Sequence, residues 1–184
     1  MEKIFIKNIN ELNIDIKSDY ILKYISKYTN EKNIEVSSKA WSYLISIFKQ
    51  QFNIDISNNE ILLNEYNKPY IKNLNYFFNI SHSKNLVAII ISDKECGIDI
   101  EYINKNYNQD IIYKVLSQNE IKYYNSCKNK INYFYSMWTK KEAYFKKIGM
   151  GINYKLLKEE NDLSQVESKL IIDNDDEYIL SYIS

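Results

Sequence analysis

The sequence predicts an α+β protein with two similar halves that meet near Glu95. Two observations support this fold class. Apolar residues recur at helical spacing before position 50 and again between positions 118 and 148. Shorter apolar runs, bounded by turn residues, follow each helical segment and are typical of strands. The 184 residues suffice for one core or for two small halves that share one.

In the first half, Met1 to Ile6 alternates polar and apolar residues as a strand does. Residues 19–28 have the spacing of a short helix. Ser37 or Ser38 could cap a second helix, which would bury Trp41 and Phe48. Segment 67–69 is expected to be a loop. Further strands are expected at residues 61–63, 76–80, 86–91 and 97–103.

The second half returns to helices. Ser117 and Glu120 have the spacing of a capping box that opens a helix. A long helix is expected over residues 132–148, with Gly149 as its C-terminal stop. Segments 168–172 and 178–183 flank a turn-forming Asn-Asp-Asp sequence and predict a hairpin.

The composition argues against several classes of function. The formal net charge is zero and the chain contains no arginine, which disfavours binding to nucleic acid or to an anionic membrane. Cys96 and Cys127 form no metal-binding spacing, so free thiols in a cytoplasmic protein are expected. The N-terminus has no apolar core of a signal peptide, and no apolar run is long enough to span a bilayer.

Two carboxylates stand on one predicted strand. Asp99 and Glu101 are two residues apart and therefore share a face, whereas Ile98 and Ile100 point to the other face, into the core. At a separation of about 6 Å the two charges repel by about 3 kcal/mol at an effective dielectric constant of 20, and a bound cation would reverse the sign. Oxygen ligands favour Mg²⁺ or Mn²⁺. A solvated strand face is the alternative.

A third carboxylate, Glu142, lies on the long predicted helix. It shares one helical face with Trp138 and Lys146, four residues away on either side. It would complete an oxygen ligand set if this helix packs on the strand of Asp99. The alternative is a surface pair between Glu142 and Lys146, and the aromatic residues beside them are expected in the core.

His82 is the only histidine and lies between Ser81 and Ser83 after an apolar strand. A ring N–H and two hydroxyls suit a phosphate oxygen, and Lys68 in the preceding loop could add positive charge. A structural histidine and an exposed lysine are the alternatives. Glu120 could be a general base near a metal, although the capping box already accounts for it.

These segments together resemble the 4′-phosphopantetheinyl transferase superfamily, in its longer surfactin-synthetase-activating type. The order and spacing of four motifs carry the resemblance. They are Asn67-Lys68-Pro69 (G-K-P in the family), Phe78-Asn79-Ile80-Ser81-His82-Ser83 (F-N-I-S-H-S), Gly97-Ile98-Asp99-Ile100-Glu101 (G-I-D-I-E) and Trp138-Thr139-Lys140-Lys141-Glu142-Ala143-Tyr144 with Lys146 (W-[ST]-x-K-E-[AS]-[YF]-x-K). Asn67 departs from the glycine of the first motif, and asparagine tolerates left-handed backbone.

The resemblance implies a role for each matching residue. Asp99, Glu101 and Glu142 would hold Mg²⁺ (or Mn²⁺) on the pyrophosphate of coenzyme A. Lys68, Ser81 and His82 would contact the end of coenzyme A that carries the 3′-phosphate. Lys146 would neutralise the pyrophosphate and stabilise the leaving phosphate, and Lys141 would support cofactor binding. Glu120 matches a glutamate that is sometimes assigned as the base for the attacking serine.

The resemblance also implies an architecture and an activity. Two pseudo-symmetric halves, residues 1–95 and 96–184, would each be a small antiparallel sheet with helices packed on it, and the cofactor would occupy the cleft between them. The enzyme would transfer 4′-phosphopantetheine from coenzyme A to a serine of an apo acyl or peptidyl carrier protein. It would act as a monomer, because one chain carries both halves of the site. A non-catalytic module that binds coenzyme A or the carrier is the alternative.

Overall fold

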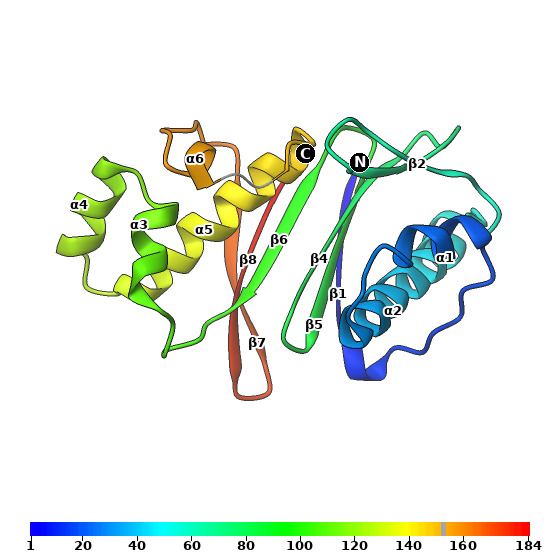
Figure 1. The fold of residues 1–184 in the computed structure, drawn as a ribbon, viewed down its shortest axis with the longest axis horizontal. Helices are drawn as coiled ribbons and strands as arrows, with labels where there is room; N and C mark the ends of the chain where they lie inside the picture. The colour runs from blue at the N-terminus through cyan, green and yellow to red at the C-terminus, as the bar shows by residue number, and fades with distance from the viewer. Residues whose placement is uncertain (152–153) are drawn as a thin grey trace.

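The computed structural model describes residues 1–151 and 154–184 and confirms the α+β fold class. Two small antiparallel sheets lie side by side in the middle of the molecule, with helices outside each of them (Figure 1). None of the helices in these two ranges is both long and apolar enough to cross a membrane.

The first sheet has the strand order β1-β5-β4, and helices α1 and α2 cover it. Its apolar side chains, among them Trp41 of α2 and Phe78 of β4, form one core with the helices. A separate two-stranded sheet, β2-β3, follows the helices along the chain. The elements are β1 (Glu2–Asn8), α1 (Asp19–Ile25), α2 (Glu31–Ile47), β2 (Ile61–Leu63), β3 (Pro69–Ile71), β4 (Phe77–Ser83) and β5 (Leu86–Ser92).

The second sheet has the order β6-β8-β7, with helix α5 lying along it. The β7–β8 hairpin turns at Asn174, which has a left-handed backbone, as its turn chemistry predicts. The elements are β6 (Gly97–Tyr102), α3 (Ile112–Val115), α4 (Gln118–Ser126), α5 (Lys130–Lys147), α6 (Tyr154–Leu157), β7 (Glu167–Asp173) and β8 (Asp176–Ile183).

The two sheets repeat one topology. In each sheet, the first strand of the chain segment (β1 or β6) pairs with the second strand of a hairpin (β5 or β8). The first strand of that hairpin (β4 or β7) forms the other edge of the sheet. The chain order is therefore strand, helices, hairpin, twice over, rather than helices followed by strands. The assignment of residues 1–95 and 96–184 as separate functional halves stays a prediction.

One helix start was predicted wrongly. Helix α2 begins at Glu31, where the Asn30 side chain accepts hydrogen bonds from the amides of Lys32 and Asn33. Ser37 and Ser38 lie buried inside the helix, so neither is its cap. The Asn30 cap precedes a polar first turn, so it lies well before the large apolar residues that mark the helix in the sequence.

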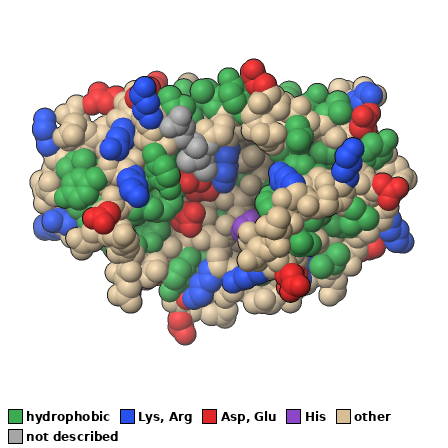
Figure 2. Space-filling view, in the orientation of Figure 1, with side chains coloured by type: hydrophobic (Ala, Val, Ile, Leu, Met, Phe, Trp, Pro, Cys, Tyr) green, Lys and Arg blue, Asp and Glu red, His purple; other side chains and the backbone are tan. Residues whose placement is uncertain are grey.

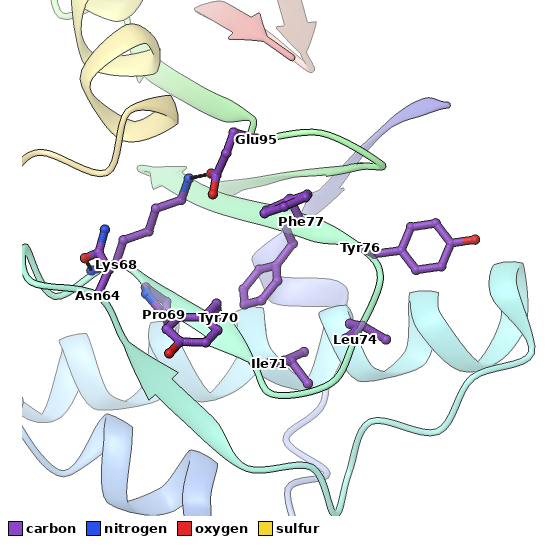
Figure 3. A pocket seen from close by; sticks show the side chains of 10 residues that line it. Asn64, Lys68, Pro69, Tyr70, Ile71, Leu74, Tyr76, Phe77 and Glu95 are labelled. Atoms are coloured by element: carbon purple, nitrogen blue, oxygen red, sulfur yellow. Dashed lines mark hydrogen bonds and ion pairs between the residues drawn. The ribbon is translucent and has the colours of Figure 1, made fainter.

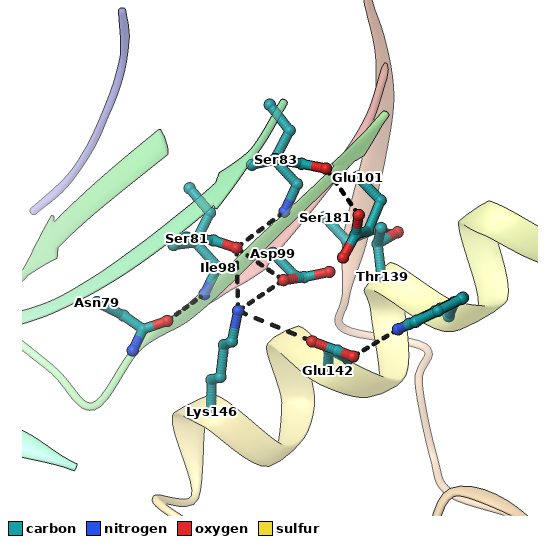
Figure 4. Close-up of polar contacts among 12 residues, drawn as sticks. Asn79, Ser81, Ser83, Ile98, Asp99, Glu101, Thr139, Glu142, Lys146 and Ser181 are labelled. Carbon is teal, nitrogen blue, oxygen red and sulfur yellow. Dashed lines mark hydrogen bonds and ion pairs between the residues drawn. The ribbon is translucent and has the colours of Figure 1, made fainter. Parts of the chain in front are cut away.

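The faces of strand β6 are divided as the alternation predicts. Ile98 and Ile100 are fully buried and pack with Ile90 of β5 and Leu180 of β8, so one apolar core extends across both sheets. Asp99 and Glu101 point to the other face, toward helix α5 (Figure 4). The same strand thus joins the two halves on one side and carries the carboxylates on the other.

Candidate functional site

Gly97 sets the distance between helix α5 and strand β6. A Cβ atom at this position would lie 2.0 Å from the carbonyl oxygen of Ala143 and 2.5 Å from the amide nitrogen of Lys147. Only a residue without a side chain permits such close packing of backbone on backbone. The contact brings Glu142 and Lys146, which directly precede these two residues of α5, over the carboxylates of β6 (Figure 4).

The Lys146 ammonium lies among three carboxylates. Its Nζ atom is 2.6 Å from Asp99 Oδ1 and 3.9 Å from Glu142 Oε2. Ser81 of β4 donates a hydrogen bond to the same Asp99 oxygen at 2.8 Å. Glu101 accepts one from Ser83 at 2.8 Å. The packing of helix on strand therefore gathers the predicted set Asp99, Glu101, Glu142 and Lys146 at one place.

This cluster has an excess of negative charge. Burial and the neighbouring Asp99 carboxylate raise the pKa of Glu101 to about 8 and that of Glu142 to about 7. Burial acts to lower the pKa of Lys146, but Asp99 and Glu142 outweigh it, so the pKa is raised and the ammonium stays charged. One cation thus faces three acidic groups, and two of these hold protons more tightly than free carboxyls do.

The residues of this cluster fit a hard divalent cation in their chemistry. All three acidic side chains offer oxygen ligands, and Asp99 Oδ2 is buried without a hydrogen-bond partner. In residues 1–151 and 154–184, however, no group of three or more His, Cys, Asp or Glu side chains is placed to hold a metal ion. Lys146 supplies the neighbouring positive charge, so a cation would bind only after side chains move.

A hollow opens beside this cluster between the two halves. In the space-filling view, the single histidine lies at the edge of the hollow, with acidic and basic side chains around it (Figure 2). His82 is exposed on strand β4. Enclosure of the ring by protein atoms and the positive charge of Lys146 lower its pKa, so the neutral ring is favoured near pH 7. Its proposed contact with a phosphate stays a prediction.

Lys68 links the β2–β3 loop to the second half. Its ammonium donates to Glu95 at 2.8 Å (Figure 3). It also donates to the carbonyl oxygens of Cys96 and Lys147 at 3.2 and 3.0 Å. The preceding Asn67 has a φ of 65°, the left-handed conformation that a glycine would also adopt there. Since its three donors are engaged, Lys68 would have to exchange a partner to bind a phosphate.

The structure places Lys141 outside the hollow. Its side chain is fully buried, and its ammonium donates to Glu120 and to the carbonyl oxygens of Val115 and Leu157. Glu120 closes the predicted capping box with the Ser117 amide. These contacts give Lys141 and Glu120 a structural explanation and engage the Lys141 ammonium with protein acceptors. The role in cofactor binding that the motif implies for Lys141 stays a prediction.

Two residues with contacts to the site were not predicted. Asn79 of β4 accepts a hydrogen bond from the Ile98 amide at 3.0 Å. Trp138 packs against the second core, as expected, and its indole N–H also donates to Glu142 Oε1. The signal for Asn79 was available, because Asn79, Ser81 and Ser83 are polar at every second position of an otherwise apolar strand.

Comparison with known proteins supports the resemblance seen in the motifs. The family described as the 4′-phosphopantetheinyl transferase superfamily matches residues 95–181, which include Asp99, Glu101, Glu142 and Lys146. Residues 95–181 therefore carry the sequence pattern of that superfamily. The match confirms the predicted family, and it covers the strand and helix that form the carboxylate cluster.

Several curated proteins of this family are similar to the chain. A 4′-phosphopantetheinyl transferase of Aneurinibacillus migulanus is 37% identical over 91 residues, which are 48% of this chain and 38% of that protein. One of Bacillus subtilis is 37% identical over 98 residues, 50% of this chain and 42% of the relative. A putative one of Haemophilus influenzae is 31% identical over 93 residues, with 48% and 40% covered. The chain thus matches about two fifths of the length of these relatives.

Proposed function

We propose that this protein transfers the 4′-phosphopantetheine group of coenzyme A to a serine of an apo acyl or peptidyl carrier protein. The gathering of Asp99, Glu101, Glu142 and Lys146 beside a hollow supports this most directly. A lysine charge among carboxylates, with one carboxylate oxygen unpartnered, suits a substrate that brings a pyrophosphate and a divalent cation. The matched relatives are named for this transfer.

The reaction exchanges one phosphorus–oxygen bond for another. The serine oxygen would bond to the phosphorus that carries pantetheine, and the bond to adenosine 3′,5′-bisphosphate would break. Lys146 would neutralise the charge that grows on the leaving phosphate. His82 and Lys68 would bind the end with the 3′-phosphate.

The serine proton needs an acceptor. Burial and the neighbouring Asp99 carboxylate raise the pKa of Glu142 to about 7, so this group is poised to take a proton near neutral pH. Glu120 is the other candidate, but its carboxylate is held by Lys141 and Ser117. The geometry therefore favours Glu142.

Mg²⁺, with Mn²⁺ as a substitute, would be held by Asp99 and Glu101, and Glu142 would be a further ligand if Glu120 takes the serine proton instead. When bound, the cation would polarise the pyrophosphate and balance its charge. The protein side chains contribute the remaining steps. They orient the pyrophosphate, keep Lys146 charged and hold the acceptor of the serine proton beside it.

The assay is direct. The protein is incubated with coenzyme A, Mg²⁺ and several apo carrier proteins, and the carriers are weighed by mass spectrometry. We expect one carrier to gain the mass of phosphopantetheine, with no gain in excess EDTA or with Asp99→Ala. Full activity of Asp99→Ala would contradict the cation site. Binding of coenzyme A and Mg²⁺ by calorimetry, without transfer to any carrier, would instead identify a non-catalytic binding module.

All four residues of the cluster come from one chain, so we propose that the monomer is the active form. Light scattering gives the mass, and specific activity is followed as the protein is diluted. Constant activity per molecule is expected. A fall in step with dissociation of an oligomer would show that the site is shared between chains.

A further inference from the structure

Strands β4 and β6 belong to different sheets but are joined along their length by side chains. Asn79 Oδ1 accepts a hydrogen bond from the amide of Ile98 at 3.0 Å. Ser81 Oγ accepts one from the Ile100 amide at 3.4 Å, and Ser83 Oγ accepts one from the Tyr102 amide at 3.0 Å. Figure 4 shows Asn79, Ser81 and Ser83 side by side along β6. We call this row of three side chains the seam.

The seam has a fixed register. Each acceptor lies 19 residues before its amide, so the two strands run parallel. Alternate residues of β4 point toward β6, and alternate amides of β6 point toward β4. Side-chain oxygens therefore take the place that backbone carbonyls hold in an ordinary sheet, and the amides at the edge of β6 remain satisfied.

The two serines of the seam also hold the carboxylates. The Ser81 hydroxyl donates its single proton to Asp99 Oδ1, and its lone pairs face the Ile100 amide and Lys146 Nζ. The hydroxyl has one donor and two acceptor sites, so its capacity is complete. Ser83 donates to Glu101 Oε2 in the same way.

We propose that Ser81 and Ser83 are positioning residues that fix Asp99 and Glu101 against strand β4. Each serine binds a carboxylate and the amide of the following residue, so the orientation of the acidic side chain is set by the register of the seam. For Ser81 this differs from direct phosphate binding, because its only proton is already donated to Asp99. The seam itself depends on the geometry alone, whereas its effect on cation binding rests on the proposed function.

The experiment compares Ser81→Ala and Ser83→Ala with Ser92→Ala. Ser92 is buried in strand β5 and contacts the Lys94 amide, so it controls for loss of a buried hydroxyl away from the carboxylates. Amide hydrogen exchange is measured by NMR in the cation-free protein. We expect exchange at Ile100 in Ser81→Ala, and at Tyr102 in Ser83→Ala, to accelerate by about tenfold, with no change in Ser92→Ala.

Cation binding is measured on the same proteins by calorimetry with Mn²⁺. Loss of a side chain that orients a ligand typically weakens metal affinity by about tenfold or more, and we expect this for both alanine variants. Ser83→Thr keeps the hydroxyl and should restore both the affinity and the protection of Tyr102. With a transfer assay, the variants should need more cation, while KM for coenzyme A at saturating cation stays unchanged.

The outcomes separate the two proposals. Unchanged exchange at Ile100 and Tyr102 in folded alanine variants would overturn the seam. Accelerated exchange with wild-type Mn²⁺ affinity would overturn the positioning role. If wild type itself binds no Mn²⁺, the proposed function loses its cation site, and exchange alone then decides on the seam. A rise in KM for coenzyme A in Ser81→Ala, with unchanged cation affinity, would assign that serine to the phosphate.

Discussion

Helix α5 carries one buried lysine, Lys141, and one partly exposed lysine, Lys146, and their surroundings differ in charge. Lys141 has no exposed side-chain surface and meets one carboxylate and two carbonyl oxygens, so its single charge is balanced. Lys146 retains 23% of its side-chain exposure and faces Asp99, Glu142 and Glu101, which together exceed its charge. The two lysines are five residues apart and point to different sides of the helix.

The difference separates a structural site from a reactive one. Around Lys141 every donor has a protein acceptor, and no group is left to bind a ligand. Around Lys146 the acidic groups outnumber the cation, the pKa values of Glu101 and Glu142 are raised, and one Asp99 oxygen has no partner. A charged substrate that enters the adjacent hollow could balance these charges, as is typical of a functional site.

The proposed difference between a structural Lys141 and a reactive Lys146 is tested most strongly by a substitution of Lys146. Replacing it with Met keeps the apolar stem and removes the charge. We expect kcat for transfer to fall by about a hundred- to a thousandfold, because the leaving phosphate loses its nearest cation. Circular dichroism should show a retained fold. A variant with wild-type kcat would mean that Lys146 serves only to hold Asp99.

The matched change at Lys141 should act on stability instead. Lys141→Met leaves Glu120 and the carbonyl groups of Val115 and Leu157 without their donor. We expect the free energy of unfolding to fall by about 3 kcal/mol, at the lower end for a broken buried pair because Glu120 is partly exposed. Denaturant unfolding measures this.

Adding Glu120→Gln to Lys141→Met should recover part of the lost stability, since no uncompensated carboxylate then remains. The kcat per folded molecule should stay at the wild-type value in both variants. A loss of kcat at saturating coenzyme A, with unchanged stability, would return Lys141 to the site and end the contrast between the two lysines.

The charge excess around Lys146 also predicts a pH dependence. Glu101 and Glu142 have pKa values of about 8 and about 7 in the folded protein, above the ordinary 4.5. The folded state therefore binds their protons more tightly than the unfolded state, and stability falls as pH rises through 7 to 8. We expect a loss of about 1–2 kcal/mol over this range in cation-free protein, measured by denaturant unfolding.

His82 affects the pH dependence of folding stability with the opposite sign. Its pKa is lowered below 6.5, so its stabilising effect grows as pH rises toward that value and is complete above it. The change in stability above pH 7 therefore reflects the titration of Glu101 and Glu142 rather than that of His82. Glu101→Gln should flatten the curve there, and Mg²⁺ should do the same if the cation binds. An identical slope in wild type and Glu101→Gln would show that this carboxyl titrates normally.

The smallest effect is expected at His82, at the edge of the hollow. His82→Ala should raise KM for coenzyme A by about tenfold, or about 1.4 kcal/mol, with little change in kcat, because the proposed contact is to a remote phosphate. The substitution should change KM little for dephospho-coenzyme A, which lacks the 3′-phosphate. Equal losses of kcat with both substrates would make the histidine catalytic or structural.

Local patterns predicted much of this fold. The strand at residues 61–63, the capping box of Ser117 and Glu120, the end of α5 before Gly149 and the final hairpin all follow from short-range chemistry that the structure confirms. The alternation along β6 correctly divided Ile98 and Ile100 from Asp99 and Glu101. The family motifs predicted which acidic residues would come together.

Long-range contacts could not be read in this way. The sequence around Lys141 and Lys146 is lysine-rich throughout, and only the tertiary position of α3, α4 and α6 decides that Lys141 is buried. Ser81 and Ser83 accept hydrogen bonds from backbone amides of another strand, which the sequence did not predict, and the expected contact of Ser81 with a ligand stays a prediction. In both places the packing decides which donors and acceptors meet.

The seam has one more consequence, for the behaviour of the protein in concentrated solution. A strand at the edge of a sheet exposes amides that can recruit a strand from another molecule, which leads to aggregation. Strands β4 and β6 are such edges, and they face each other with the amides of Ile98, Ile100 and Tyr102 engaged by side chains. The row of three small polar residues, of which Ser81 and Ser83 are proposed to orient the acidic groups, therefore also closes two edges to association.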